Sequence, residues 1–348
     1  MQKRLSLGKL DFRLLENLLK KYQGVSDPRV VIGPRVGEDA AVIDLPDRYL
    51  VAKTDPITFA TEKIGWYAVQ VNGNDIAIRG ASPKWFQATI LLPEKRTTRK
   101  LVGKIFAQIS FACKKLGVAM IGGHTEISWG LDRPIVIGCM LGEVEKEKLV
   151  CTSGAKPRDM IVLTKGIVIE GTSIIAFEKQ EELKKKGYSS AFIQKCQSFL
   201  YNPGISVVKE ALLANQFEVH SMHDPTEGGL AVGLYEIAVA SKVGLLIEKE
   251  KIPVLEESVI LCKEYNLDPL RTITSGTLLI TTPLKSSQKI IRLLKRNGIK
   301  AGVIGEVKQK DFGIKILSQG KIRDLKISAQ DEITKIFNGY PKRFGVVK

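Results

Sequence analysis

Short apolar runs alternate with amphipathic stretches in the first half of the chain, a pattern that predicts strands interspersed with helices. Leucines recur at helical spacing within residues 9–22, so we expect an amphipathic helix there. Short β-like runs follow, and a second helical stretch covers about residues 64–79. Thr98 can cap a third helix, and Gly117 supplies its left-handed stop before a strand over residues 118–123.

The periodic pattern stops at residues 151–159, where Ser, Gly and Pro interrupt it. Strands and helices alternate again after this segment, which is typical of an α/β or α+β domain. A chain of 348 residues also exceeds what a single hydrophobic core usually supports. We therefore expect two domains and an appended C-terminal helix. The predicted divisions are residues 1–150, residues 151–330 and a tail at residues 331–348.

The composition narrows the class of protein. Hydrophobic residues make up 44% of the chain and charged residues 26%, which excludes a mostly disordered protein. No apolar run is long enough to cross a membrane, and the N-terminal stretch is too charged for a signal peptide, so we expect a cytoplasmic protein. The five cysteines are scattered without a C-x-x-C pair, which argues against a zinc or redox site.

The charge balance bears on the ligand. The chain has 53 basic and 37 acidic residues, and its net charge of +16 favours anionic ligands. The basic residues are spread along the chain, and no RNA-recognition motif, helix-turn-helix or zinc finger occurs. We therefore expect an anionic small-molecule or carrier substrate rather than nucleic acid.

Three aspartates stand at turn-rich ends of the predicted elements: Asp39 in GEDAA, Asp55 in KTDP and Asp75 in NGND. Any one of them could be an ordinary cap or turn residue. Together they offer the hard oxygen ligands that Mg²⁺ prefers, and Mg²⁺ usually needs a phosphate-bearing ligand to complete its shell. The neighbouring Asn74 could add a neutral oxygen or hold a carboxylate.

Two glycine pairs are candidate phosphate contacts. In IGGHTE, at residues 121–126, the pair Gly122 and Gly123 could expose backbone N–H groups to an anion, or could form a plain tight turn. In HDPTEGGL, Asp224 or Thr226 can cap a helix whose first turn holds a second glycine pair. That pair, Gly228 and Gly229, fits either phosphate approach or close packing.

The motifs GEDAAV, KTDP, NGNDIAIRGASP, IGGHTE, SGA-x-PRD, HDPTEGGL and ASKVG occur in this order along nearly the whole chain. In this order they resemble the superfamily of aminoimidazole ribonucleotide synthetase, thiamine-monophosphate kinase, selenophosphate synthetase and the hydrogenase-maturation protein HypE. The segments LSLGKL, MHDPT, KIPV and LDPLRTITSG are most similar to HypE. Seven motifs in order are a strong signal, although each alone is weak.

The resemblance implies an N-terminal α/β domain that forms a homodimer by joining its sheet to a partner's. A C-terminal α+β domain would fold over it, and ATP would bind between the domains, near the dimer interface. By motif, the Mg²⁺ ligands are Asp39, Asp55 and Asp75. The nucleotide-binding residues are Asn74, Gly122, Gly123, Thr125, Asp224, Gly228 and Gly229, and the residues placed at the reaction itself are Lys9, Asp75 and His124. Lys9 could close over the nucleotide or be an ordinary surface lysine.

Relatives of this kind use ATP to phosphorylate an acceptor, often a carbonyl or amide oxygen. Three departures limit what can be transferred to this chain. The chain ends PKRFGVVK with no cysteine after Cys262, so we do not expect the HypE reaction on a tail cysteine. His124 stands where relatives usually have aspartate, and Glu227 where HypE usually has arginine. We therefore expect a HypE-like paralogue with an altered acceptor; the alternatives are a small-molecule kinase like thiamine-monophosphate kinase and a non-catalytic nucleotide-binding partner protein.

Overall fold

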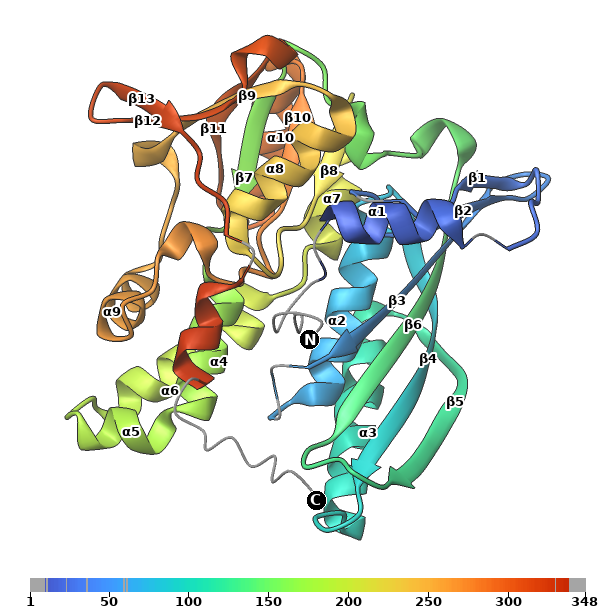
Figure 1. Ribbon diagram of the computed structural model, residues 1–348, viewed down its shortest axis with the longest axis vertical. Coiled ribbons are helices and arrows are strands. Elements are labelled where there is room, and N and C mark those ends of the chain that lie inside the picture. The colour runs from blue at the N-terminus through green and yellow to red at the C-terminus, as the bar shows by residue number, and fades with distance from the viewer. Residues whose placement is uncertain are drawn as a thin grey trace, which may run out of the picture.

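The computed structural model describes residues 10, 12–22, 24–35, 37–58, 60, 62–328 and 330–337. These residues form two β-sheets, each with its own helices (Figure 1). The strands of the first sheet come from residues 30–144 and those of the second from residues 160–324. The predicted boundary at residue 150 falls in the connection between them.

The first sheet has the strand order β1-β2-β3-β6-β4-β5. Its strands pair antiparallel, except that β4 and β5 run parallel. The strands are β1 (Val30–Ile32), β2 (Ala41–Asp44), β3 (Tyr49–Ile57), β4 (Ser82–Pro93), β5 (Ala119–Ser128) and β6 (Ile135–Val144); the helices are α1 (Phe12–Lys21), α2 (Ile64–Ala77) and α3 (Arg99–Leu116). Helices α1 and α2 therefore lie within the stretches predicted as helical, residues 9–22 and 64–79.

Helix α2 is the central element of the molecule, because every one of its residues is buried. It packs against β3 and β6 on one side and against α7 of the second domain on another. A helix that is buried all round needs an apolar sequence on every face, and the polar residues it does contain must be satisfied internally. This helix carries Asp75 and Asn74, so it places polar side chains at the junction of the two domains.

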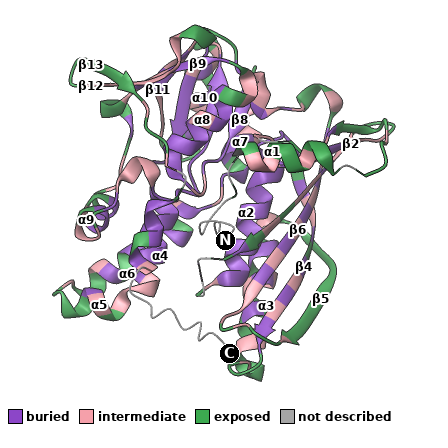
Figure 2. Ribbon diagram, in the orientation of Figure 1, coloured by how far each residue is buried: buried purple, intermediate pink, exposed green. Residues whose placement is uncertain are grey.

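Helix α3 begins and ends as the sequence predicts. The Thr98 side chain accepts a hydrogen bond from the backbone N–H of Leu101, and Gly117 adopts the left-handed conformation at the C-terminal end. The following strand is longer than predicted, because β5 continues through the glycine pair to Ser128. It lies at the sheet edge and is exposed along almost its whole length, as Figure 2 shows.

The second sheet has the strand order β13-β12-β9-β11-β7-β10-β8 and is antiparallel apart from the parallel pair β9 and β12. Helices α7 and α10 pack together, and α10 also contacts β7 and β11, whereas α8 contacts β8 and β9. The strands are β7 (Met160–Thr164), β8 (Ser221–His223), β9 (Gly244–Glu248), β10 (Leu279–Thr282), β11 (Ala301–Lys308), β12 (Ile314–Ser318) and β13 (Lys321–Asp324). The helices are α4 (Ile169–Glu178), α5 (Gln180–Lys185), α6 (Ser190–Ser198), α7 (Val208–Ala214), α8 (Gly229–Ser241), α9 (Glu256–Glu264) and α10 (Leu284–Arg296).

The predicted C-terminal helix is a short 3-10 helix, η7 (Glu332–Phe337), in the described part of the tail. Asp331, Ile333 and Ile336 are buried, and the two isoleucines belong to the hydrophobic core. None of the helices in the described residues is long and apolar enough to cross a membrane.

Candidate metal and nucleotide site

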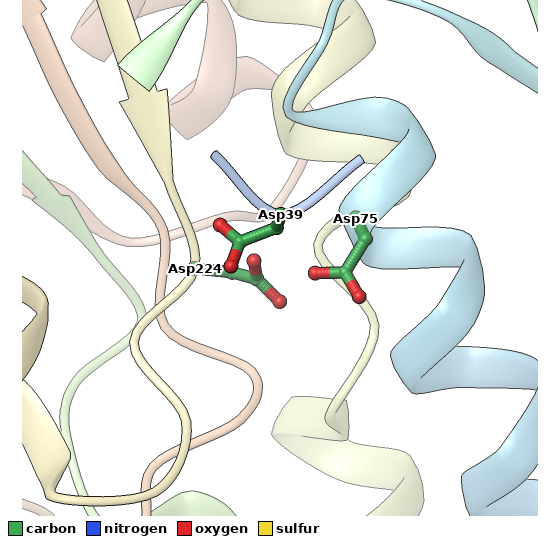
Figure 3. A group of neighbouring side chains, drawn as sticks. All are labelled: Asp39, Asp75 and Asp224. Carbon is green, nitrogen blue, oxygen red and sulfur yellow. The ribbon is translucent and has the colours of Figure 1, made fainter. Parts of the chain in front are cut away.

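Three carboxylates meet where the two domains join. Asp39 lies in the loop before β2, Asp75 on α2 and Asp224 directly after β8. One carboxylate oxygen from each lies within 4.8 Å of the others. Figure 3 shows the three side chains converging from separate elements. We call this group the carboxylate triad.

Asp39 is held in place by the residue before it. The Glu38 carboxylate pairs with the Arg79 guanidinium, which is fully buried at the end of α2. The Glu38 carboxylate also accepts hydrogen bonds from the backbone N–H groups of Thr152 and Ser153. Arg79 in turn donates a 2.6 Å hydrogen bond to the Thr152 hydroxyl. The loop that carries Asp39 is thus fixed to both α2 and the interdomain connection.

A buried histidine supports the triad from the second domain. His223 Nδ1 lies 3.1 Å from Asp39 Oδ2, and Nε2 lies 2.8 Å from Glu236 Oε2. Burial lowers the pKa of His223, but the Asp39 and Glu236 carboxylates have the larger effect and raise this pKa to about 10. The ring is therefore protonated. For Asp39 the two effects have the opposite signs. Burial raises the pKa of this carboxyl, but the surrounding cations, above all His223, hold the pKa below its ordinary value.

The other two carboxylates are harder to ionise. Burial raises the pKa of Asp75 to about 7, with neighbouring carboxylates adding to the shift and Lys53 opposing it. Burial and the charges of Asp75 and Asp39 raise the pKa of Asp224 well above its ordinary value. Asp224 is only 2% exposed, and neither of its oxygens has a hydrogen-bond partner in the described part of the chain.

An unpartnered buried carboxylate beside two others is unfavourable unless a cation joins them. All the ligand atoms of the triad are hard oxygens, with no thiolate or imidazole nitrogen among the three, which is the donor set that Mg²⁺ prefers. The triad therefore fits a Mg²⁺ ion. Of the three residues predicted as metal ligands, the structure brings Asp39 and Asp75 together, and it adds Asp224, which the sequence assigned to the nucleotide.

The triad opens into a cavity of about 400 Å³ that Lys53 and Arg35 also line. A second cavity of about 220 Å³ adjoins it and shares Asp55 and Thr226 with it. We call the second cavity the acidic chamber; its polar lining is Asp55, Thr58, Glu170, Thr226, Glu227 and Ser275. The two cavities together could hold a phosphate chain beside a small second molecule.

Asp55 and Asn74 do not hold the positions predicted for them. Asp55 lines both cavities but is not one of the triad, and it pairs with Lys53 at 3.4 Å. Asn74 is fully buried, and its amide makes two hydrogen bonds to backbone of the second domain, one with Ile205 and one with Val207. Both ends of the amide are thus used in joining the domains, and Asn74 lines neither cavity.

The glycine pair of the second domain is needed for packing. A Cβ at Gly229 would come within 2.8 Å of backbone atoms of Leu270 and Thr272. The N–H of Gly228 already donates a 2.5 Å hydrogen bond to the Asp331 carboxylate, which occupies the start of α8 and would repel an anion. The structure thus contradicts the phosphate role of Gly228 and Gly229, and neither Asp224 nor Thr226 caps this helix.

The residues of IGGHTE lie on β5, with β4 and β6 between this strand and β3. Gly122, Gly123, His124 and Thr125 do not line the triad cavity of their own chain. The His124 side chain is 67% exposed and lies 3.2 Å from Glu126. The glycine pair is part of an edge strand rather than a tight turn, and the pairing of β5 with β4 shifts its register just before Gly122. Lys9 lies outside the described residues.

Lys53, His223 and Glu236 were not among the predicted site residues. A strand period of two would have placed Lys53 on the same face as Asp55. His223 directly precedes Asp224, so the HDPTEGGL motif already contained it. Nothing in the sequence links Glu236 to this site, because its contact depends on how α8 packs against β8.

The sequence matches two domains described as AIR synthase related protein, the N-terminal domain over residues 37–144 and the C-terminal domain over residues 156–316. The chain is 28% identical over 314 residues to a hydrogenase expression/formation protein of Methanocaldococcus jannaschii, covering 88% of this chain and 90% of that protein. It is 26% identical to the carbamoyl dehydratase HypE of Rhizobium leguminosarum, covering 80% and 79% of the two chains.

Solved structures support the same fold. A hydrogenase maturation protein HypE in complex with ATP aligns with a TM-score of 0.66 at 22% identity, covering 88% of this chain and 92% of that one. AaThiL complexed with AMPPCP and TMP aligns with a TM-score of 0.67 at 21% identity, covering 84% and 90%. The two-domain fold with two mixed sheets is thus confirmed. The chain belongs to the AIR synthase related protein family.

Proposed function

We propose that this protein is an ATP- and Mg²⁺-dependent enzyme that phosphorylates an oxygen of a small acceptor. The observation that carries the proposal is the carboxylate triad, in which Asp224 is buried with no hydrogen-bond partner among the described residues. The relatives support it, since one HypE is described in complex with ATP and AaThiL with AMPPCP. When bound, Mg²⁺ would neutralise the phosphate chain of ATP during transfer.

The chain's own residues would orient and balance this charge. Asp39, Asp75 and Asp224 would hold the metal, with His223 fixing Asp39 through the 3.1 Å contact. Lys53 stays protonated, because the carboxylates around it outweigh the effect of burial and raise its pKa. Such a transfer needs positioning and electrostatic stabilisation more than covalent participation by the protein.

The acidic chamber suggests the nature of the acceptor. Burial raises the pKa of Glu170 to about 7, and Asp55 and Glu227 also line this space. Such a lining repels an anion, so we propose a small neutral acceptor with an amide or carbonyl oxygen in place of the anionic substrate that the net charge favours. A HypE-like paralogue acting on such an amide would dehydrate it after phosphorylation.

The acceptor reaction can be followed without knowing the natural substrate. A panel of small neutral amides, with ATP and Mg²⁺, would be examined by phosphorus NMR. Dehydration would release inorganic phosphate, whereas a kinase of the AaThiL kind would leave a stable phosphorylated product. Turnover confined to anionic acceptors would contradict the role of the acidic chamber.

We also propose that two copies assemble through β5 and the open face of the first sheet. Edge strand β5 exposes Ile121 and Ile127, and Trp129 just beyond it is 88% exposed. Ile137 and Leu141 of β6 are only half-buried on the face turned away from α2. An unpaired apolar edge of this kind is suited to pairing with another strand. A partner's β5 could then bring Thr125 and the glycine pair toward the triad.

The homodimer is tested by sedimentation of the wild type, Ile121→Arg and the control Ile322→Arg. Ile322 is also exposed but lies on β13 of the second domain. We expect Ile121→Arg to shift the protein to the monomer and the control to leave it unchanged. A monomeric wild type, or a dimer that tolerates Ile121→Arg, would contradict this interface.

The nucleotide site is tested by calorimetric titration with ATP, with and without Mg²⁺. We expect the wild type to bind ATP only with Mg²⁺, and Asp224→Asn to lose at least about tenfold in affinity because one of three ligands is gone. The control is Asp311→Asn, an exposed aspartate of the second domain. A wild type that does not bind ATP would refute the proposal, as would equal binding by Asp224→Asn.

A further inference from the structure

Lys53 lies between the carboxylate triad and the acidic chamber. Its ammonium nitrogen is 3.1 Å from Asp75 Oδ2 and 3.4 Å from Asp55 Oδ1. Lys53 and Asp55 are two residues apart on β3, so their side chains leave the same face of the sheet, the face on which α2 places Asp75. The Lys53 side chain is only 13% exposed, so the ammonium group is enclosed by the site.

The position of this ammonium group is where a second metal ion would bind. Two-metal phosphoryl-transfer sites place their ions about 3.5–4 Å apart and bridge them with a shared ligand. Here Asp75 belongs to the triad and also contacts Lys53, so it is the group that two cations would share. Asp55 would be the remaining ligand of a second ion, but its described cationic neighbour is Lys53.

We propose that Lys53 is a built-in second cation, so that the protein itself holds one divalent ion at the triad and uses Asp55 to anchor Lys53. This inference rests on the metal site of the proposed function and deepens it. An ammonium group acts on phosphate as a point charge. It is present at every Mg²⁺ concentration, whereas a second metal ion would have to be recruited.

The assignment also explains why Asp55 differs from the other predicted metal residues. The triad members are largely buried and converge on one point, whereas the Asp55 side chain is 38% exposed and its charge is matched by Lys53. Removing Lys53 would leave Asp55 and Asp75 without this cation. A divalent ion could then bind between them, with Asp55 as an indispensable ligand.

The test counts Mn²⁺ ions bound to the nucleotide-free protein, using the electron paramagnetic resonance signal of free Mn²⁺. We expect one ion in the wild type, two in Lys53→Met, and one again in the double variant Lys53→Met/Asp55→Asn. The control Lys84→Met removes a lysine that pairs with Glu143 elsewhere on the first sheet, and it should bind one ion. Lys53→Arg keeps the charge and should also bind one ion. Circular dichroism would establish that each variant is folded.

The outcomes separate this inference from the proposed function. Two ions in the wild type would overturn the role of Lys53, as would one ion in a folded Lys53→Met. Should Lys53→Met not fold, Lys53→Gln takes its place with the same expected count of two. No Mn²⁺ binding by the wild type would remove the triad as a metal site and overturn both proposals. The ion counts could also come out as expected while the wild type fails to bind ATP. That result would support the role of Lys53 and refute only the proposal that the protein is an ATP-dependent enzyme.

Discussion

The triad should make the metal-free protein less stable than it could be, and Asp224→Asn tests this directly. Both oxygens of Asp224 are buried without a hydrogen-bond partner among the described residues. A buried unsatisfied polar group costs about 1–3 kcal/mol, and the neighbouring Asp39 and Asp75 add like charge. The asparagine amide has nearly the same shape, carries no charge and can donate to either neighbour. We therefore expect Asp224→Asn to raise the free energy of unfolding by about 1–3 kcal/mol in chelator at pH 8.

The sign of the pH dependence follows from the raised pKa of Asp224. An acid whose pKa is higher in the folded state contributes stability that is fully present below its unfolded pKa and is lost as pH rises through the folded value. The advantage of Asp224→Asn should accordingly be small near pH 4 and grow toward pH 8. Mg²⁺ should reverse it, because an ion at 100 times its Kd stabilises the wild type by about 2.7 kcal/mol.

Urea titrations at pH 4 to 8, with chelator or with Mg²⁺, measure both effects. Asp311→Asn is the matched control, and we expect it to follow the wild type in every condition. The reasoning would be refuted if Asp224→Asn were less stable than the wild type in chelator at pH 8. A variant that gained as much from Mg²⁺ as the wild type would equally show that Asp224 is not a ligand.

Three further substitutions test other parts of the structure. Asn74→Ala should lower the free energy of unfolding in urea by about 2–4 kcal/mol, because two buried backbone groups lose their partner. The ATP affinity of the folded protein should not change. A stable variant that no longer bound ATP would indicate that Asn74 does belong to the nucleotide site. Gly229→Ala should destabilise by about 1–3 kcal/mol, since its Cβ would press on backbone and its φ is +66°; calorimetric unfolding that matched the wild type would contradict this packing. The free energy of unfolding of Glu170→Gln should rise relative to that of the wild type as pH rises from 4.5 to about 7, by about 3 kcal/mol in all, because burial raises the pKa of Glu170. A difference independent of pH would show that Glu170 is not buried as described.

The sequence predicted well those parts of the molecule that depend on local patterns. The cap at Thr98, the stop at Gly117 and the helix over residues 64–79 all follow from spacing and turn chemistry within a few residues. Asp39 and Asp75 were predicted together because aspartates in turn-rich motifs suit a metal, and the structure places their carboxylates side by side. The chain length and the break in periodicity at residues 151–159 predicted two domains, and the resemblance supplied how the two are arranged.

The errors concern contacts between residues distant in the sequence. Asn74 adjoins Asp75 of the triad, but its side chain leaves α2 toward the second domain, where it meets Ile205 and Val207. Gly228 and Gly229 suit a phosphate by composition, yet the space beside them is filled by residues about forty positions later and by Asp331. A motif specifies residue types, whereas the direction of each side chain depends on how separate elements pack.

The polar network around the triad bears on how the site would bind its ligands. Asp39 and Asp75 come from the first domain and Asp224 from the second, so one cation would contact both. The domains are already joined beside it by Arg79, which links Glu38 to Thr152, and by the hydrogen bonds that the Thr152 and Ser153 backbone N–H groups donate to Glu38. Because these links hold the three carboxylates together without a metal, ion binding would require little rearrangement. Most of the binding free energy of Mg²⁺ would then remain available for affinity, which is the advantage of a preorganised site.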